Sequence, residues 1–443
     1  MTIRCPDDNA GRLRKWPKPL LRFLSAHRLR QASYAPLLAA GMGIMFLRLL
    51  VMAWLLDLAA FAALSAGLIV SSLVTLAACF GLFPHLQRRL PVHLVRGHLR
   101  AAGVQMGQTI LAALAVALIG LLVAFSNMSA GSISSTAILV GTVHGLAQQL
   151  FLIATTESRS NNEPVRYARQ HLLRSLLMSA AGIAAALLFG SAEAVLIAEA
   201  VVGYAAVLII LAAVRRRFGL PLAKVAPLAL RSFKRVNWLS MGTLLIYALI
   251  SAVIVNLDRW LSAILLSPDD FARYSFAWIV IIAAMSVQAL VNASVYPMIA
   301  RRFALHGARN AFRLTFITSS LLLVLSLLAI GPAVYVVHQA IPRFFPQYAE
   351  ATSIIAVLAI VAAFKVSEFW STFLIIGGHE RSAVVSLLFG LVAGIALWQF
   401  WLLWNPGSGI HLLELAYLPL SLTLTLYIFQ FLASVRVIRK SRL

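Results

Sequence analysis

The sequence has few charged residues and almost no cysteine. Of its 443 residues, only 12% are charged, whereas 61% are hydrophobic and the mean hydropathy is +0.90. An ordinary soluble domain carries about 25% charged residues, so this chain has too little polar surface to fold as a water-soluble globule. The two cysteines, Cys5 and Cys79, are too far apart in sequence to form a ligand pair. This spacing excludes a disulfide framework and a cysteine-based zinc or redox motif.

Sequence motifs for catalysis are also lacking. No Gly-x4-Gly-Lys-Ser/Thr phosphate loop occurs, so the chain has no motif for driving a step with ATP. Neither His-Glu-x-x-His nor Gly-x-Ser-x-Gly is found. His85, His93 and His98 gather in a basic segment without carboxylates, which we interpret as interfacial and not metal-binding. We therefore expect no enzyme activity, no metal and no cofactor.

Long apolar runs dominate what is present. A bilayer core needs about 20 apolar residues per helix, and twelve runs of about that length follow one another along the chain. They lie near 35–56, 60–82, 103–125, 133–155, 172–189, 192–213, 238–257, 274–299, 313–337, 351–376, 383–404 and 413–434. Residues 1–34 are basic and have no apolar core, so we expect no cleavable signal peptide. The predicted fold class is an all-α polytopic membrane protein.

The basic residues alternate with these spans. The chain has 37 Lys and Arg against 14 Asp and Glu, a net charge of +23. If the N-terminus is cytoplasmic, 32 of the 37 fall in inner segments and three in outer loops, while Arg48 and Lys365 lie inside spans. This positive-inside pattern predicts a multi-pass protein of the bacterial inner membrane with both termini in the cytoplasm. Because the charge is spread over seven short segments, we expect it to attract anionic membrane lipids and not nucleic acid.

An internal repeat divides the chain into halves. Residues 55–65 resemble residues 265–275 at an offset of 210, with five identical positions. Six crossings per half return the chain to the same side, so the two lobes have the same orientation, as in parallel-repeat transporters. The predicted domains are a basic cytoplasmic tail (1–34), a six-helix lobe (35–213), a basic cytoplasmic linker (214–237), a second six-helix lobe (238–434) and a basic cytoplasmic tail (435–443).

Ionisable groups inside spans are the first candidates for function, because each costs about 2.5–3.5 kcal/mol at a helix centre. Arg48 lies roughly 20 Å from the inner end of the first span, and its guanidinium suits a phosphate or a sugar carboxylate. The alternative is a structural pair with an acid or with backbone carbonyls. Glu199 is a partner for Arg48, a carrier of a coupling proton, or a neutral acid bonded to a neighbouring helix. Lys365 and Glu368 share a predicted helix face, which favours an internal ion pair, with substrate contact by Lys365 as the alternative.

Polar side chains also recur at helical spacing inside spans. On the seventh span they form one face from Ser240 to Asp258, and Asp258 corresponds to Arg48 at the repeat offset. Such faces do not point at lipid, so they line a wet cavity or form interhelical hydrogen bonds. The candidate cavity or substrate residues are Arg48, Tyr247, Ser251, Gln288, Asn292 and Lys365. The candidates for ion coupling or internal pairing are Glu199, Asp258 and Glu368. His144 and Gln148 form a similar pair on the fourth span, for which packing is favoured.

The stretch from Asn256 to Gly307 carries a family resemblance. It begins Asn-Leu-Asp-Arg-Trp-Leu-Ser, continues with Pro-Asp-Asp-Phe at 268–271, and ends with Tyr-Pro and an arginine pair before Gly307. Residues 345–351 then read Phe-Pro-Gln-Tyr-Ala-Glu-Ala. With twelve spans in two lobes, the chain resembles the polysaccharide-transport branch, the O-antigen flippases, of the multidrug/oligosaccharidyl-lipid/polysaccharide exporter superfamily. Lipid II flippases of that superfamily usually carry two further helices, which the predicted spans do not include.

The resemblance implies a transporter with a central cavity between its lobes. It would move undecaprenyl-pyrophosphate-linked oligosaccharides to the outer leaflet by alternating access, for O-antigen, capsule or exopolysaccharide synthesis. Its partners would be this lipid-linked oligosaccharide, a polysaccharide polymerase and a chain-length regulator. The alternative is a cation-coupled multidrug antiporter of the same superfamily, which needs cavity carboxylates. A membrane polymerase or ligase needs a larger outer loop than the 16 residues of 258–273, and a channel fits the two-lobe repeat less well.

Overall fold

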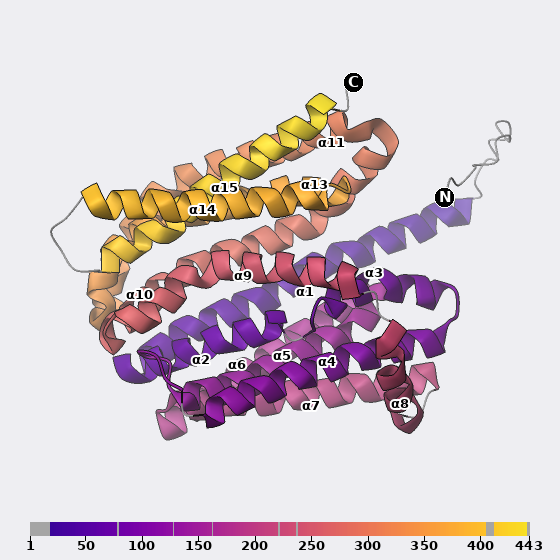
Figure 1. The fold of residues 1–443 in the computed structure, drawn as a ribbon, viewed down its shortest axis with the longest axis horizontal. Helices are drawn as coiled ribbons and strands as arrows, with labels where there is room; N and C mark the ends of the chain where they lie inside the picture. Colours follow the sequence, from indigo (N-terminus) through magenta and orange to yellow (C-terminus); the bar gives the residue numbers. More distant parts are fainter. Residues whose placement is uncertain are drawn as a thin grey trace.

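The computed structural model consists of α-helices joined by short connections (Figure 1). It describes residues 18–77, 79–126, 128–161, 163–219, 222–235, 238–404 and 412–440. Within these ranges, the only β-type pairing is an isolated bridge between Ala130 and Ile133. Twelve helical segments of the described chain are long and apolar enough to cross a membrane, and each overlaps one of the twelve predicted spans. The predicted all-α polytopic class is therefore confirmed. Cys5 lies outside the described residues.

The first lobe is built from seven helices. They are α1 (Lys18–Leu55), α2 (Leu58–Ala77), α3 (Leu82–Val95), α4 (Leu99–Phe125), α5 (Ser135–Ser160), α6 (Pro164–Phe189) and α7 (Ala192–Phe218). Helix α1 begins well before its predicted span, so the basic N-terminal segment is helical from Lys18 onwards. Glycines on α5 allow a close approach to α2, because a Cβ at Gly141 would lie 2.6 Å from the Gly67 carbonyl oxygen.

A short connector links the two lobes. It contains α8 (Leu222–Ser232) and a 3₁₀ turn, η1 (Phe233–Arg235). Helix α8 packs against α4, where the Gln108 amide donates a hydrogen bond of 2.8 Å to the Ser232 hydroxyl. The connector is thus fastened to the first lobe.

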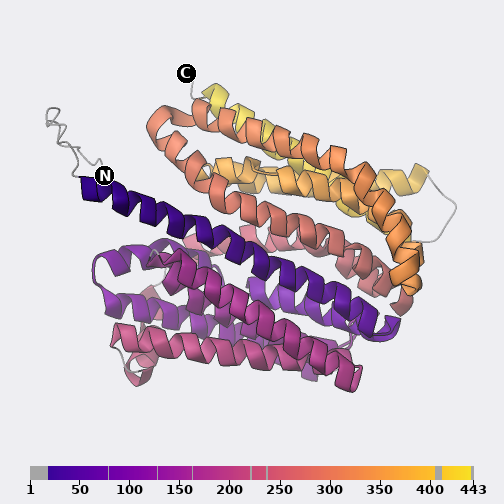
Figure 2. The ribbon, with the colours of Figure 1, turned by 180° about the vertical axis from the view of Figure 1, so that it is seen from behind.

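The second lobe contains the remaining helices. They are α9 (Trp238–Leu265), α10 (Pro268–Ala277), α11 (Ile279–Phe344), η2 (Pro346–Ala351), α12 (Thr352–Ser367), α13 (Trp370–Ile376), α14 (Glu380–Trp404) and α15 (Leu412–Lys440). Helix α11 holds parts of two spans, which are joined where Gly307 adopts φ 77° and ψ 178°. Figure 2 shows the chain reversing its direction along α11. The break between α9 and α10 falls 210 residues after the break between α1 and α2.

The two lobes touch at the ends that the charge pattern assigns to the outer side. The Ser132 N–H donates a hydrogen bond of 2.7 Å to the Ala263 carbonyl oxygen. The Gln347 amide donates one of 3.0 Å to the Ala53 carbonyl oxygen. In Figure 1 the lobes meet beside α10 and diverge towards the end where α1 begins and α15 ends. We refer to these outer contacts as the outer gate.

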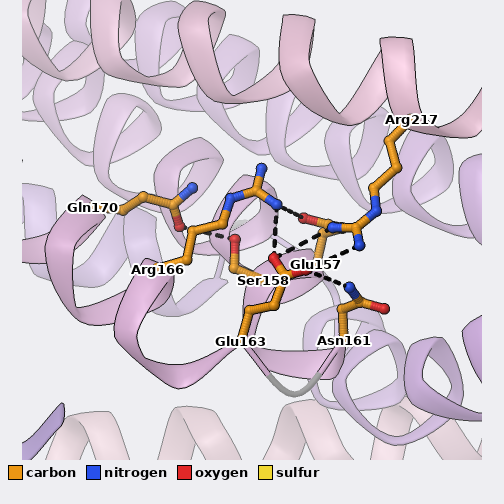
Figure 3. A network of polar contacts seen from close by, with 7 residues as sticks. All are labelled: Glu157, Ser158, Asn161, Glu163, Arg166, Gln170 and Arg217. Atoms are coloured by element: carbon orange, nitrogen blue, oxygen red, sulfur yellow. Dashed lines mark hydrogen bonds and ion pairs between the residues drawn. The ribbon is translucent and has the colours of Figure 1, made fainter. Parts of the chain in front are cut away.

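An ion-pair network ties together the other ends of α5, α6 and α7 (Figure 3). Glu157 is fully buried, and its carboxylate lies 2.8 Å from the Arg217 guanidinium. Glu163 accepts hydrogen bonds from Arg217 at 2.9 Å, and from Arg166 and Asn161 at 2.8 Å. The Arg217 guanidinium is the main cause that lowers the pKa of Glu163 to about 2. The network holds the three helix ends together as one unit.

The depressed pKa makes the contribution of Glu163 to stability depend on pH. It is fully present above the carboxyl's ordinary value of 4.5 and is lost as the pH falls from there through about 2. We expect Glu163→Gln to lower the melting temperature of the purified protein by roughly 2–4 °C at pH 7. Melting curves at a series of pH values should show this difference shrinking steadily below pH 4.5. Asp269→Asn, at an exposed site, is the control, and a difference independent of pH would contradict the assignment.

Candidate functional site

A cavity of about 740 Å³ lies between the two lobes. Helices α1, α3, α5 and α6 of the first lobe form one wall, and α11 of the second lobe forms the other. Its polar lining residues are Tyr34, Arg48, Gln87, Arg159, Tyr167, His171, Arg174, Ser175, Ser286, Asn292 and Tyr296. Three of them are arginines, and no Asp or Glu of the described chain lines this cavity. We call it the inter-lobe cavity.

Arg48 forms a buried ion pair at the wall of this cavity. Its partner is Glu199 on α7, and the two residues are 4% and 0% exposed. The Glu199 carboxylate also lies 3.3 Å from His144 Nε2, and His144 Nδ1 lies 2.8 Å from the Ser71 hydroxyl. Gly182 on α6 makes room for the acid, because a Cβ there would lie 2.5 Å from Glu199 Oε1. Arg48 thus has both properties considered from the sequence, an acid partner and a place on a cavity wall.

A second buried arginine, Arg174, lines the same cavity. The positive-inside count assigned it to an inner segment, but α6 begins at Pro164, so Arg174 lies roughly 15 Å along the helix. It is 8% exposed, it donates a hydrogen bond to the Gln148 amide oxygen, and its guanidinium lies 4.4 Å from the centre of the Phe151 ring. Pro164 is the sequence feature that indicates the earlier start of this helix, because proline favours the first turn of a helix.

A smaller cavity of about 160 Å³ lies inside the second lobe. Ser251, Gln288 and Lys365 line it, together with Glu368. The residues predicted to line one cavity are therefore divided between two cavities, because Arg48 and Asn292 line the inter-lobe cavity. Helix α11 borders both, with Gln288 on the smaller cavity and Asn292 on the larger. Tyr247, like Ser240 and Thr243, has a side chain outside the described part of the structure.

The ion pair expected between Lys365 and Glu368 is not formed. Helix α12 ends at Ser367, so the two residues do not share a helical face. Glu368 turns towards the start of α13, where its carboxylate accepts hydrogen bonds from the Ser371 N–H at 3.0 Å and the Ser371 hydroxyl at 3.2 Å. The Gln288 amide donates to the Glu368 backbone carbonyl at 2.8 Å. The polar contacts of Glu368 therefore stabilise the break between α12 and α13.

Asp258 is paired inside the second lobe. It is 1% exposed and accepts hydrogen bonds from the Tyr274 hydroxyl at 2.7 Å and the Trp278 indole at 2.9 Å. Its neighbour Arg259, which the charge pattern assigned to an outer loop, is also buried and stacks 4.5 Å from the centre of the Trp278 ring. In the structure Asp258 lies away from the inter-lobe cavity, although it corresponds to Arg48 in the repeat.

The whole two-lobe arrangement is found in solved transporter structures. An inward-facing multidrug resistance MATE family transporter of the MOP superfamily matches with a TM-score of 0.62 and 13% identity, over 91% of this chain and 94% of its own. An outward-facing one matches with 0.63 and 10% identity, over 93% and 96%. The eukaryotic MATE transporter AtDTX14 matches with 0.59 and 14% identity, over 93% and 96%. No protein-family model and no curated protein matches the sequence. The chain therefore has the MATE transporter fold.

Proposed function

We propose that this protein is an alternating-access transporter that moves a lipid-linked anionic oligosaccharide to the outer leaflet of the bacterial inner membrane. The observation that carries the proposal is the inter-lobe cavity, which three arginines line without any described carboxylate. A site of this charge attracts phosphate or acidic sugars and repels cations. An undecaprenyl-pyrophosphate-linked oligosaccharide has both an anionic group and sugars, and it cannot cross a bilayer unaided.

The remaining lining of the cavity suits sugars. Tyr34, Tyr167 and Tyr296 supply aromatic faces and hydroxyls, and Gln87 and Asn292 supply amides. Asn292 Oδ1 is buried and has no hydrogen-bond partner, so it is ready to accept one from a ligand. The volume of about 740 Å³ is within the range of pockets that hold small molecules. A headgroup of a few sugar rings therefore fits, with its lipid chain left in the bilayer.

The closed outer gate supports alternating access. In this conformation the lobes touch at their outer ends, and the cavity is lined by residues from the other half of the spans, such as Tyr34 and Arg159. Solved structures with this fold are described as inward-facing and as outward-facing. We infer that this chain alternates between two such states, that its working site is the inner membrane, and that a polymerase and a chain-length regulator act on its product.

The alternative is a cation-coupled multidrug antiporter, which the names of the matching structures favour. An antiporter for cationic drugs needs an acid facing its cavity. Glu199 does not line the inter-lobe cavity, and its carboxylate is held by Arg48 and His144. The cavity charge therefore favours the anionic cargo.

Transport in proteoliposomes separates these functions. The purified protein is reconstituted with a fluorescent undecaprenyl-pyrophosphate-linked disaccharide, and the fraction that a membrane-impermeant quencher reaches is followed with time. We expect flipping well above that of empty liposomes, and no uptake of ethidium driven by a proton or sodium gradient. Ethidium transport without flipping of the lipid would establish the antiporter and reject the flippase.

A further inference from the structure

Arg174 carries a buried positive charge for which the described part of the chain provides no acid within ion-pair distance. Its hydrogen-bond partner, Gln148, is a neutral amide, and Phe151 offers only an aromatic face. Its Nε is buried and has no hydrogen-bond partner. Burying a guanidinium without a counter-charge is costly. Such a group is expected where a ligand supplies the missing negative charge.

Arg48 differs from Arg174 in having an acid in direct contact, although the Nε of Arg48 is likewise buried and without a hydrogen-bond partner. Glu199 neutralises the charge of Arg48 by direct contact, although both arginines line the same cavity. The cationic side chains of the inter-lobe cavity that have no described acid in direct contact are therefore Arg174, which Glu199 reaches only at longer range, and Arg159, which is exposed at the end of α5. An anion that enters past Arg159 meets Arg174 deeper along the spans. This ordering reverses the priority that the sequence pattern gave to Arg48.

We propose that Arg174 is the residue that binds the oxyanion of the cargo, a phosphate, pyrophosphate or carboxylate group. A guanidinium presents parallel N–H groups to such an anion, and no group of the described chain accepts a hydrogen bond from the Nε–H of Arg174. His171 and Ser175 are its neighbours on α6 and line the same cavity, so they add donors beside it. Arg48 is then a structural partner of Glu199. The inference deepens the proposed function and rests on it.

Binding of small isoprenyl probes tests the assignment without a transport assay. The full-length protein, in nanodiscs of neutral phosphatidylcholine, is titrated with farnesyl pyrophosphate, farnesol, inorganic pyrophosphate and glucuronate. We expect farnesyl pyrophosphate to bind roughly 30-fold more tightly than farnesol. Arg174→Gln should weaken it by roughly 30-fold, to the level of farnesol, and Arg174→Lys should fall between, because lysine keeps the charge but loses the paired N–H geometry. Arg309→Gln, at an exposed site, should bind like the wild type.

The variants also distinguish the role of Arg174 from the role of Arg48. Arg48→Gln/Glu199→Gln removes a neutral pair, so its loss of farnesyl pyrophosphate binding should be much smaller than that of Arg174→Gln. A variant is included in the comparison only if it elutes as a single folded species. The assignment is overturned if Arg174→Gln binds like the wild type, or if the double variant loses as much.

The probes distinguish this inference from the proposed function. If the wild type does not prefer farnesyl pyrophosphate, inorganic pyrophosphate or glucuronate over farnesol but still flips the lipid-linked disaccharide, the role of Arg174 is wrong and the flippase stands. If inorganic pyrophosphate binds as tightly as farnesyl pyrophosphate in an Arg174-dependent way, Arg174 is an oxyanion site but the cargo is not lipid-linked. Preference for glucuronate would place an acidic sugar, and not the pyrophosphate, at Arg174.

Discussion

Replacing Arg48 by methionine should lower the free energy of unfolding by about 3–5 kcal/mol, because Glu199 would be left as a buried, uncompensated charge. Both side chains are almost fully buried, so water cannot screen the remaining carboxylate. Loss of export in Arg48→Ala would therefore follow from a weakened first lobe, whether or not Arg48 touches cargo. Denaturation of the purified protein, followed by tryptophan fluorescence and by thermal melting, measures the effect directly.

The double variant Arg48→Met/Glu199→Gln provides the matched comparison. Removing both charges leaves no unpaired ion, so most of the lost stability should return. The amide introduced by Glu199→Gln would still reach His144, whose Nε2 lies 3.3 Å from the native carboxylate. If the double variant is as unstable as Arg48→Met, the ion pair is not the cause of the loss, and packing around Arg48 would have to explain it.

Gly131→Ala should prevent the outer gate from closing and should reduce transport by more than tenfold. A Cβ at Gly131 would lie 2.3 Å from the Ala263 carbonyl oxygen and 2.7 Å from the Ile264 Cα, both in the second lobe. Backbone atoms cannot move aside as side chains do, so the lobes must separate. An alanine in the left-handed region, with φ +58°, also carries strain of about 1–2 kcal/mol. The clash, unlike this strain, acts only when the lobes meet.

Gly190→Ala isolates the effect of the clash from that of the strain. Gly190 has φ +61°, but no atom lies within 4 Å of a Cβ placed there. Spin labels at Met128 and Phe344, both exposed near the outer ends of the two lobes, report the separation between them. We expect the distance distribution to lengthen in Gly131→Ala and to stay at the wild-type value in Gly190→Ala. Equal distributions in the two variants would show that Gly131 plays no part in the gate.

The spans could be predicted because hydropathy and length act along the chain. Each of the twelve predicted runs corresponds to a helical segment of sufficient length, and the break after Leu55 recurs after Leu265. The predictions that failed were those that depended on the exact ends of helices. The charge count grouped Arg174 with the inner residues because it lies at the very start of the predicted span 172–189, whereas α6 begins at Pro164. The basic and polar first turns of that helix hide its start from a hydropathy criterion.

The candidate site was less predictable because it depends on contacts between helices. The interval of three residues between Lys365 and Glu368 favoured a pair, but no glycine or proline announces that α12 ends at Ser367. The pairing of Arg48 with Glu199 joins residues 151 apart, and the sequence offered it only as one alternative. The separation of Asn292 from Gln288, one helical turn away, into another cavity requires knowing which helices pack on each side of α11.

Helix α11 is a partition between two chambers of unequal size, the inter-lobe cavity and the smaller cavity of the second lobe. If it tilts during the transport cycle, one chamber expands as the other contracts. A small solute or a few water molecules lodged beside Lys365 would then have to be expelled before the partition could move in that direction. Under that condition, water held in the smaller cavity would slow the movement of α11, and the rate of the cycle would depend on osmotic pressure.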